Sequence, residues 1–158
     1  MPNLDPGRPG TKEAFGISVV APDGVVRIPP KAFAHYEFRA GELAVAATTH
    51  RGEPGFALLN KSRAETTVFR NIIDQLPQPD DVQRFNGKAY SLVRLGPDCL
   101  HLSPCLLDAF LLHPGDRLMS VKSTTVALSF SPAKIWAEKF RRRNRLLAAA
   151  NVLKQDVF

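Results

Sequence analysis

The stretch Val26-Arg-Ile-Pro-Pro-Lys-Ala-Phe-Ala-His-Tyr-Glu-Phe-Arg-Ala-Gly-Glu42 has the same pattern as Leu100-His-Leu-Ser-Pro-Cys-Leu-Leu-Asp-Ala-Phe-Leu-Leu-His-Pro-Gly-Asp116, at an offset of 74 along the chain. In both copies an apolar residue is followed by a proline, a short amphipathic segment and a Gly-acid turn, without a gap. The aligned pairs are Ile28/Leu102, Pro30/Pro104, Phe33/Leu107, Tyr36/Phe110, Phe38/Leu112, Gly41/Gly115 and Glu42/Asp116. A long repeat that occurs only twice predicts two fused half-domains rather than a repeat array.

Length and composition indicate an ordinary globular protein. The chain has 158 residues, of which 44% are hydrophobic, so it forms one domain or two small ones that share a core. The longest apolar runs, at 43–47 and 146–150, are too short to span a bilayer. The start of the chain contains no apolar stretch of the kind found in signal peptides. We therefore expect a soluble cytoplasmic protein that does not engage a membrane.

The net formal charge of +6 at pH 7 is concentrated in one segment. Between residues 134 and 145 the chain carries six cations and one acid, Glu138, which gives this segment a charge of +5. The six cations are Lys134, Lys139, Arg141, Arg142, Arg143 and Arg145. Concentrated positive charge attracts nucleic acids through phosphate neutralisation and counterion release. The alternative interpretation is a solvated helix face or a solubilising tail.

The first copy predicts two hairpins on either side of a short helix. Two β-branched runs flank Ala21-Pro-Asp-Gly24, which is a turn signal, and the prolines at 29 and 30 end the second run and start a helix. Ala32, Phe33 and Tyr36 form the apolar face expected of that helix. The predicted elements of this copy are strands at 17–20, 25–28, 43–47 and 56–59, with a loose hairpin tip at 50–55.

The second copy predicts the same order of elements. Its expected strands lie at 90–95, 100–102, 118–121 and 125–130, and its helix at 104–110. Because Phe56-Ala-Leu58 matches Val126-Ala-Leu128 at an offset of 70, we expect its second hairpin to have a tip four residues shorter. Between the copies we expect a helix at 64–76 and a polar connection at 78–87, and after them a long helix at 133–153.

These elements divide the chain into five segments. A disordered N-terminal segment occupies 1–13, the first repeat 14–60, a linking helix and loop 61–88, the second repeat 89–131, and a basic amphipathic C-terminal helix 132–158. One hairpin–helix–hairpin unit is too small to bury its own apolar face. Two interleaved units can close a barrel-like core and remove most sheet edges.

The sequence resembles the SpoVT/AbrB swapped-hairpin family. The resemblance is carried by 23–29 with Ala40-Gly-Glu42, and by 98–104 with Pro114-Gly-Asp116. In arrangement it is similar to the MraZ-like branch, in which two copies lie on one chain. The resemblance implies a mainly β fold with short helices, in which two AbrB-like repeats form one pseudo-twofold barrel, followed by the C-terminal helix.

The resemblance also implies a DNA-binding transcriptional regulator. MraZ-like proteins carry Asp-x-x-Gly-Arg in each copy, and its arginine faces DNA. Here Asp23-Gly-Val-Val-Arg27 has the arginine displaced, and His101 occupies the matching position of the second copy. The residues expected to bind duplex DNA are Arg27, Lys31, Lys134, Lys139, Arg141, Arg142, Arg143 and Arg145. Self-association remains open.

The second hypothesis is a non-enzymatic protein-interaction or scaffold module that has lost the DNA-binding surface. In that case the basic helix would dock onto an acidic protein. The helix of the second copy has no cation between 105 and 112, which favours this hypothesis. Both hypotheses predict a protein without enzymatic activity, cofactor or small-molecule substrate, because the sequence has no nucleophile elbow, Walker loop or dinucleotide-binding glycine motif. Cys99, His101, Cys105 and His113 are zinc-ligand types, but they lack the paired spacing of structural sites, so we expect no metal.

Overall fold

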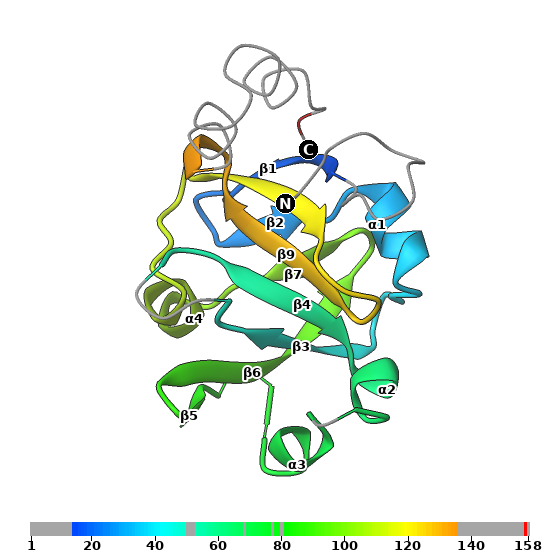
Figure 1. Ribbon diagram of the computed structural model, residues 1–158. Helices are drawn as coiled ribbons and strands as arrows, with labels where there is room; N and C mark the ends of the chain where they lie inside the picture. The colour runs from blue at the N-terminus through cyan, green and yellow to red at the C-terminus, as the bar shows by residue number, and fades with distance from the viewer. Residues whose placement is uncertain are drawn as a thin grey trace.

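The computed structural model describes residues 14–49, 53–67, 69–76, 78–79, 81–135 and 157. Its strands form a nearly closed, antiparallel, barrel-like sheet with short helices around it (Figure 1). The prediction of a mainly β fold with short helices is therefore confirmed. The strands are β1 (Ala14–Val19), β2 (Val25–Arg27), β3 (Leu43–Ala47), β4 (Phe56–Asn60), β5 (Gln83–Phe85), β6 (Lys88–Gly96), β7 (Cys99–His101), β8 (Arg117–Lys122) and β9 (Ala127–Pro132). The helices are α1 (Pro30–His35), α2 (Lys61–Ala64), α3 (Arg70–Ile73) and α4 (Pro104–Ala109).

The two halves of the chain, 14–60 and 88–132, contribute alternately to the sheet. The strand order is β1-β8-β9-β4-β3-β6-β7-β2, and β5 pairs with β6 outside this order. The pairs β1·β8, β2·β7, β3·β6 and β4·β9 each join one half to the other. The helices α1 and α4 lie on opposite sides of the barrel, and α2, α3 and β5 gather at one end (Figure 1). Four of the strand pairs in the sheet therefore need both halves, whereas β3·β4, β6·β7 and β8·β9 form within one half.

The offset between the halves is 74 only in their middle parts, which include β2 with β7 and α1 with α4. In the second hairpin of each half, Ala44 pairs with Asn60, whereas Leu118 pairs with Pro132. In the second half the loop between the strands of this hairpin, 123–126, is four residues shorter than 48–55, as predicted, but the pairing places the returning strand at an offset of 72 rather than the predicted 70. The motif Phe-Ala-Leu resembles Val-Ala-Leu in letters, but strand pairing sets the register so that each buried side chain faces the core.

The core lies inside the barrel and is covered at its sides by α1 and α4. Tyr36 and Phe110, the equivalent aromatic residues that directly follow α1 and α4, are both 0% exposed, whereas Phe33 and Leu107 are half-buried against the same core. Phe56 stacks between Phe110 and Phe130, with ring centroids 5.3 and 4.7 Å away. The predicted inward faces of the two short helices are therefore confirmed, most fully at the two aromatic positions.

The predicted single helix at 64–76 was wrong, because the chain forms two separate short helices, α2 and α3. The hydroxyl of Thr66 donates to the carbonyl of Arg63 at 2.7 Å, and that of Thr67 to the carbonyl of Ala64 at 2.6 Å. The Thr67 hydroxyl oxygen also accepts from the amide of Phe69 at 3.2 Å. Threonine hydroxyls that bond nearby backbone groups compete with helical hydrogen bonds, which ends α2 after Ala64.

The connection at 78–87, predicted to be polar loop, contains β5. This strand forms a hairpin with β6 in which Phe85 pairs with Lys88. Asn86 and Gly87 take positive φ values of 52° and 78°, as a two-residue hairpin turn requires. Asn-Gly was thus a turn signal for a strand that the sequence prediction missed.

The predicted N-terminal disorder at 1–13 and most of the predicted C-terminal helix lie outside the described residues. Residues 133–135, directly after β9, are helical. No helix among the described residues is long and apolar enough to cross a membrane.

Gly24 and Gly41 provide a matched test of how closely the halves approach. Both have φ of +86°, but a Cβ at Gly24 would lie 2.2 Å from the carbonyl oxygen of Leu102, whereas one at Gly41 would have no neighbour within 4 Å. We expect Gly41→Ala to lower the free energy of unfolding by about 1–2 kcal/mol, the cost of left-handed backbone. Gly24→Ala should lower it clearly more, because the backbones must also separate. Chemical denaturation of both variants measures the difference, and equal losses would contradict the close approach.

Candidate nucleic-acid interface

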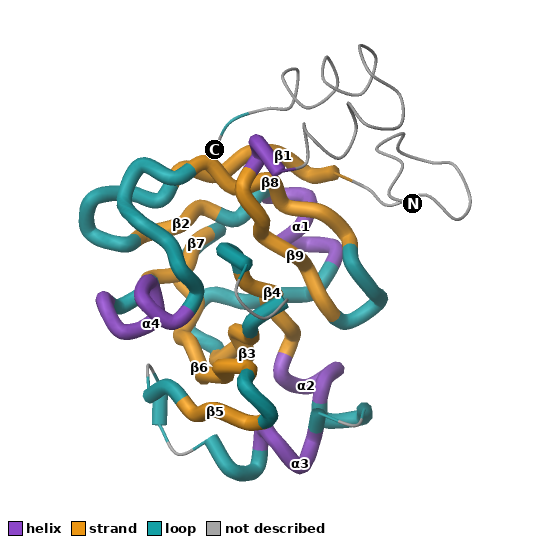
Figure 2. Tube along the Cα trace, turned by 60° about the vertical axis from the view of Figure 1, so that its left-hand side comes forward, coloured by secondary structure: helices purple, strands orange, loops and turns teal. Residues whose placement is uncertain are grey.

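The pair of strands β2 and β7, called the ribbon below, forms the side of the barrel opposite β4 and β9 (Figures 1 and 2), and β7 also pairs with the end of β6 through Leu95 and Gly96. The three pairs of the ribbon are Val25 with His101, Val26 with Leu100, and Arg27 with Cys99. Val26 and Leu100 are buried, and the two outer pairs are exposed or half-buried. Strand alternation therefore directs Arg27 and His101, one from each half, to the outer face of the ribbon.

The ribbon is fixed by reciprocal hydrogen bonds between the two halves. The amide of Ile28 donates to the carbonyl of Asp98 at 2.8 Å, and the amide of Leu102 donates to that of Gly24 at 2.9 Å. Each bond ties the turn of one half to the strand end of the other. These two hydrogen bonds therefore fix the backbone of the ribbon at both of its ends, and with it the position of the outer face.

Arg27 and Lys31, the two cations predicted for the first copy, are both exposed. Arg27 ends β2, and Lys31 lies in the first turn of α1, where Pro29 and Pro30 connect strand to helix. Within the described part of the chain, neither side chain has a salt-bridge partner. Both can therefore meet an external anion without first breaking an ion pair there.

His101 takes part in the structure of the ribbon itself. Its Nε2 atom lies 2.7 Å from the carbonyl oxygen of Asp23, so that nitrogen carries the proton and donates. The Asp23 carboxylate accepts from the amide of Val25 at 3.2 Å. The histidine that stands in place of a second arginine thus holds the turn of the other half.

Lys134 lies away from the ribbon. It is exposed and follows β9, which stands opposite β2 and β7 in the order of strands. Arg117, which is also exposed, precedes Leu118, and Leu118 pairs with Pro132. The pairing therefore brings Arg117 beside the start of the basic segment. Sequence reasoning missed this cation because it lies well before that segment in the chain.

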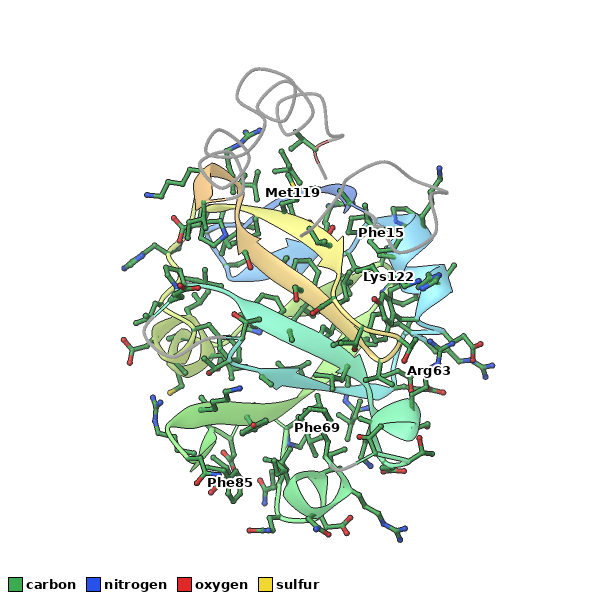
Figure 3. All side chains as sticks on the ribbon, viewed as in Figure 1. Phe15, Arg63, Phe69, Phe85, Met119 and Lys122 are labelled. Atoms are coloured by element: carbon green, nitrogen blue, oxygen red, sulfur yellow. The ribbon has the colours of Figure 1, made fainter. Side chains whose placement is uncertain are left out.

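Arg63 illustrates a cation that is already engaged. Its Nη2 atom lies 3.0 Å from Oε1 of Glu37, and its Nη1 donates to the carbonyl of His35 at 3.4 Å (Figure 3). A second bond from Nη1, of 3.5 Å, reaches the carbonyl of Thr125 in the tip of the second hairpin. Arg63 therefore joins α1, α2 and this tip, which leaves it poorly suited to bind phosphate.

The charge of the described residues is nearly balanced. They include twelve Lys and Arg against ten Asp and Glu, a net formal charge of +2. Two of the acids, Asp23 and Asp98, are exposed in the turns at the two ends of the ribbon. Of the net charge of +6, the larger part therefore lies outside the described residues. The predicted binding residues Lys139, Arg141, Arg142, Arg143 and Arg145 lie outside the described residues.

The zinc-ligand types noted in the sequence are spread over several elements. Cys99 is half-buried on β7, and Cys105 is exposed in the first turn of α4. His101 is bonded to the turn at Asp23, and the Nδ1 atom of His113 lies 4.0 Å from Oδ2 of Asp116. Across the described residues, no three His, Cys, Asp or Glu side chains are grouped so that they could hold a metal ion.

No protein-family model, no curated protein and no solved structure matches this chain.

Proposed function

We propose that this protein is a DNA-binding transcriptional regulator of the AbrB-like type. In this proposal the two interleaved halves are swapped-hairpin repeats, and duplex DNA is bound through the first repeat and the basic C-terminal segment. Arg27 and Lys31 read or orient the DNA. Lys134, Lys139, Arg141, Arg142, Arg143 and Arg145 neutralise phosphates.

The observation that carries the proposal is the exchange of strands between the halves. Four strand pairs cross from one half to the other, and the reciprocal bonds at Ile28 and Leu102 repeat the same contact in both directions. This is the arrangement expected of two swapped-hairpin repeats on one chain. It supports the family resemblance, and DNA binding is inferred from that resemblance and from the charge.

Two features of the ribbon support its role in recognition. Its outer face carries an arginine with no ion-pair partner among the described residues, on a strand pair tied at both ends by backbone bonds. Paired β-strands can enter the major groove of B-form DNA, and in this proposal the outer face of β2 and β7 does so, although β7 is also paired with the end of β6. An arginine there can donate two hydrogen bonds to a guanine, which would make Arg27 a source of sequence discrimination.

The basic segment would supply affinity that does not depend on sequence. If its five cations from Lys139 to Arg145 contact phosphates, the logarithm of the affinity falls with the logarithm of salt concentration by about 0.9 per contact. Replacement of Arg141, Arg142 and Arg145 by glutamine should flatten this slope by up to about three units and weaken all duplexes alike. Titrations of fluorescent duplexes at several salt concentrations measure the slope.

Substitutions on the ribbon should give a different result. Arg27→Gln with Lys31→Gln is expected to reduce discrimination between a selected duplex and a random one, because these side chains meet base edges or fix the register. The matched control is Arg63→Gln, which removes a cation already bonded to Glu37. If the control lowers discrimination as much as the ribbon variant, the ribbon does not read DNA.

A protein-interaction or scaffold module is the second candidate. The observation that favours it is the pair of exposed acids, Asp23 and Asp98, at the ends of the ribbon, together with the near-neutral described residues. Here the basic segment binds an acidic protein instead of DNA. This hypothesis predicts no duplex binding by the intact protein at moderate salt, and that result would end the regulator proposal.

A further inference from the structure

Arg94 is an exposed cation of the second half that lies beside the ribbon. In β6 it occupies the point where this strand passes from pairing with β3 to pairing with β7, because Arg94 pairs with Leu43 and the next two residues pair with β7. On either side of it along β6, Val93 and Leu95 belong to the core of the barrel. Strand alternation therefore directs Arg94 to the outer surface.

The outer face of the ribbon continues onto β6 at Arg94. The pairing of Leu95 with Leu100 places Arg94 opposite His101, one residue further along the two antiparallel strands. Arg27 lies on β2, on the other side of β7, and also points outward. Arg94, His101 and Arg27 therefore share one outer face, on three neighbouring strands.

The guanidinium of Arg94 is held by a backbone carbonyl rather than by an acid. Its Nη1 atom donates to the carbonyl oxygen of Gly41 at 2.6 Å, in the turn between α1 and β3 of the first half. Among the described residues Arg94 forms no ion pair, not even with Glu42 of the same turn. An arginine carries five N–H donors. The contact thus fixes the direction of the side chain and leaves its charge and most of its donors available to an anion.

Comparison of the two halves shows that the turn does not require an arginine at this position. Leu95 exchanges two backbone hydrogen bonds with the turn at 41–42, and Val20 exchanges the same two with the equivalent turn of the second half. Arg94 therefore corresponds to Val19. Because the equivalent turn forms with a valine there, a variant that lacks the arginine is expected to fold.

The spacing of the two arginines suits a duplex whose major groove faces the ribbon. Arg27 and Arg94 are offset by two strands and by two residues along them. With about 4.8 Å between strands and about 3.3 Å between residues, their Cα atoms lie roughly 12 Å apart. This is about the width of the major groove of B-form DNA. When Arg27 faces the base edges, Arg94 is therefore far enough to the side to reach the phosphates that border the groove.

We propose that Arg94 is a phosphate-binding residue, which the second half contributes to the DNA interface. This role rests on the proposed function and adds a contact to it: a phosphate oxygen accepts from the N–H groups of Arg94 that Gly41 does not use. Such a contact fixes the register of the ribbon on the duplex without distinguishing bases. Through β6, the second half thus supplies the cation that its own ribbon strand lacks at His101.

The test compares Arg94→Gln with Arg70→Gln in the full chain. Arg70 is the matched control, because it is also exposed but lies on α3, at the end of the barrel where α2, α3 and β5 gather (Figure 1). The probes are a fluorescent duplex selected from a random pool and an unselected one, titrated at several salt concentrations. Arg94→Gln should flatten the log–log salt slope by about 0.9, the value of one phosphate contact, and weaken both duplexes by the same factor. Arg70→Gln should leave the slope unchanged, and Arg94→Lys, which keeps the charge, should restore it.

The outcomes separate this role from the proposed function. If the unaltered chain binds duplex and Arg94→Gln has the same slope as Arg70→Gln, the role of Arg94 is overturned and the proposed function stands. Absence of duplex binding by the unaltered chain would overturn both.

A second measurement uses the unaltered chain and therefore does not depend on the folding of a variant. In nuclear magnetic resonance spectra of the 15N-labelled protein, the side-chain Nε–H signal of Arg94 should move when duplex is added, whereas that of Arg70 should not. An unmoved Arg94 signal at saturating duplex would contradict the phosphate contact.

Discussion

Residues 14–76 and 88–158, expressed separately, are expected to give unfolded or aggregated chains, or dimers in which each half pairs with a second copy of itself. The reason is that the pairs β1·β8, β2·β7, β3·β6 and β4·β9 all cross between the halves. A separated half therefore loses a strand partner at each of its four corresponding strands. Circular dichroism and sedimentation of each half provide the measurement.

Mixing the two halves supplies the control. If the shared core is correct, the mixture should recover the β-sheet signal and the single cooperative transition expected of an intact domain. A half that is monomeric and unfolds cooperatively by itself would refute the shared core. The outcome also bears on the proposed repeats, because a half that pairs with itself is what a single-copy swapped-hairpin protein would do.

Phe110→Ala is expected to lower the free energy of unfolding by about 3–5 kcal/mol, the usual cost of truncating a buried phenylalanine and leaving a cavity. Phe110 is 0% exposed and stacks on Phe56, which in turn stacks on Phe130. For a chain of this size the midpoint of thermal unfolding should fall by about 10 °C or more. Chemical and thermal denaturation measure both quantities.

Asp108→Ala is the matched control, in the helix that Phe110 directly follows. Asp108 is exposed, and alanine is a better helix former, so the change in stability should stay within about 0.5 kcal/mol. A small loss from both substitutions would mean that the apolar face of α4 does not support the core. A large loss from both would point to a role for the helix that is separate from its buried face.

Much of the fold followed from short-range signals in the sequence. The repeat of 26–42 at 100–116 predicted equivalent elements, and β2 with β7 and α1 with α4 do recur at an offset of 74. The spacing of Tyr36 and Phe110 within their helices predicted that both would be buried, as they are. These predictions succeeded because helix faces and turns depend on residues a few positions apart.

Errors arose where the sequence offered competing local choices. The apolar spacing of 64–76 suited a helix, but the hydroxyls of Thr66 and Thr67 bond to carbonyls and separate α2 from α3. The register of the second hairpin was predicted from the similarity of Phe56-Ala-Leu58 to Val126-Ala-Leu128. In the structure, β9 pairs with β8 and β4 in a register that differs from this prediction by two residues. Asn86-Gly87 is a turn signal typical of a β-hairpin. The polar residues around it led to the prediction of a loop, so β5 was missed.

For the candidate site, the sequence indicated which cations belong to the first copy but not their surroundings. Arg27 and Lys31 are exposed as expected. Strand pairing between distant parts of the chain determines those surroundings. It places His101 against Asp23, brings Arg117 beside the basic segment and separates Lys134 from the ribbon. No local pattern contains that information.

The sequence by itself determined the repeated order of strands and helices, the buried faces of α1 and α4, and the places where turns require glycine. The tertiary structure decided which strands pair, and therefore that strands of one half pair with strands of the other. It placed Arg27 opposite Cys99 in the ribbon, and it formed the bridge between Ile17 and Val157, which lie near opposite ends of the chain. The physical reason is that helices and turns are closed by neighbouring residues, whereas a strand's hydrogen bonds can be satisfied by any edge with matching alternation. Only packing of the whole core selects among those edges.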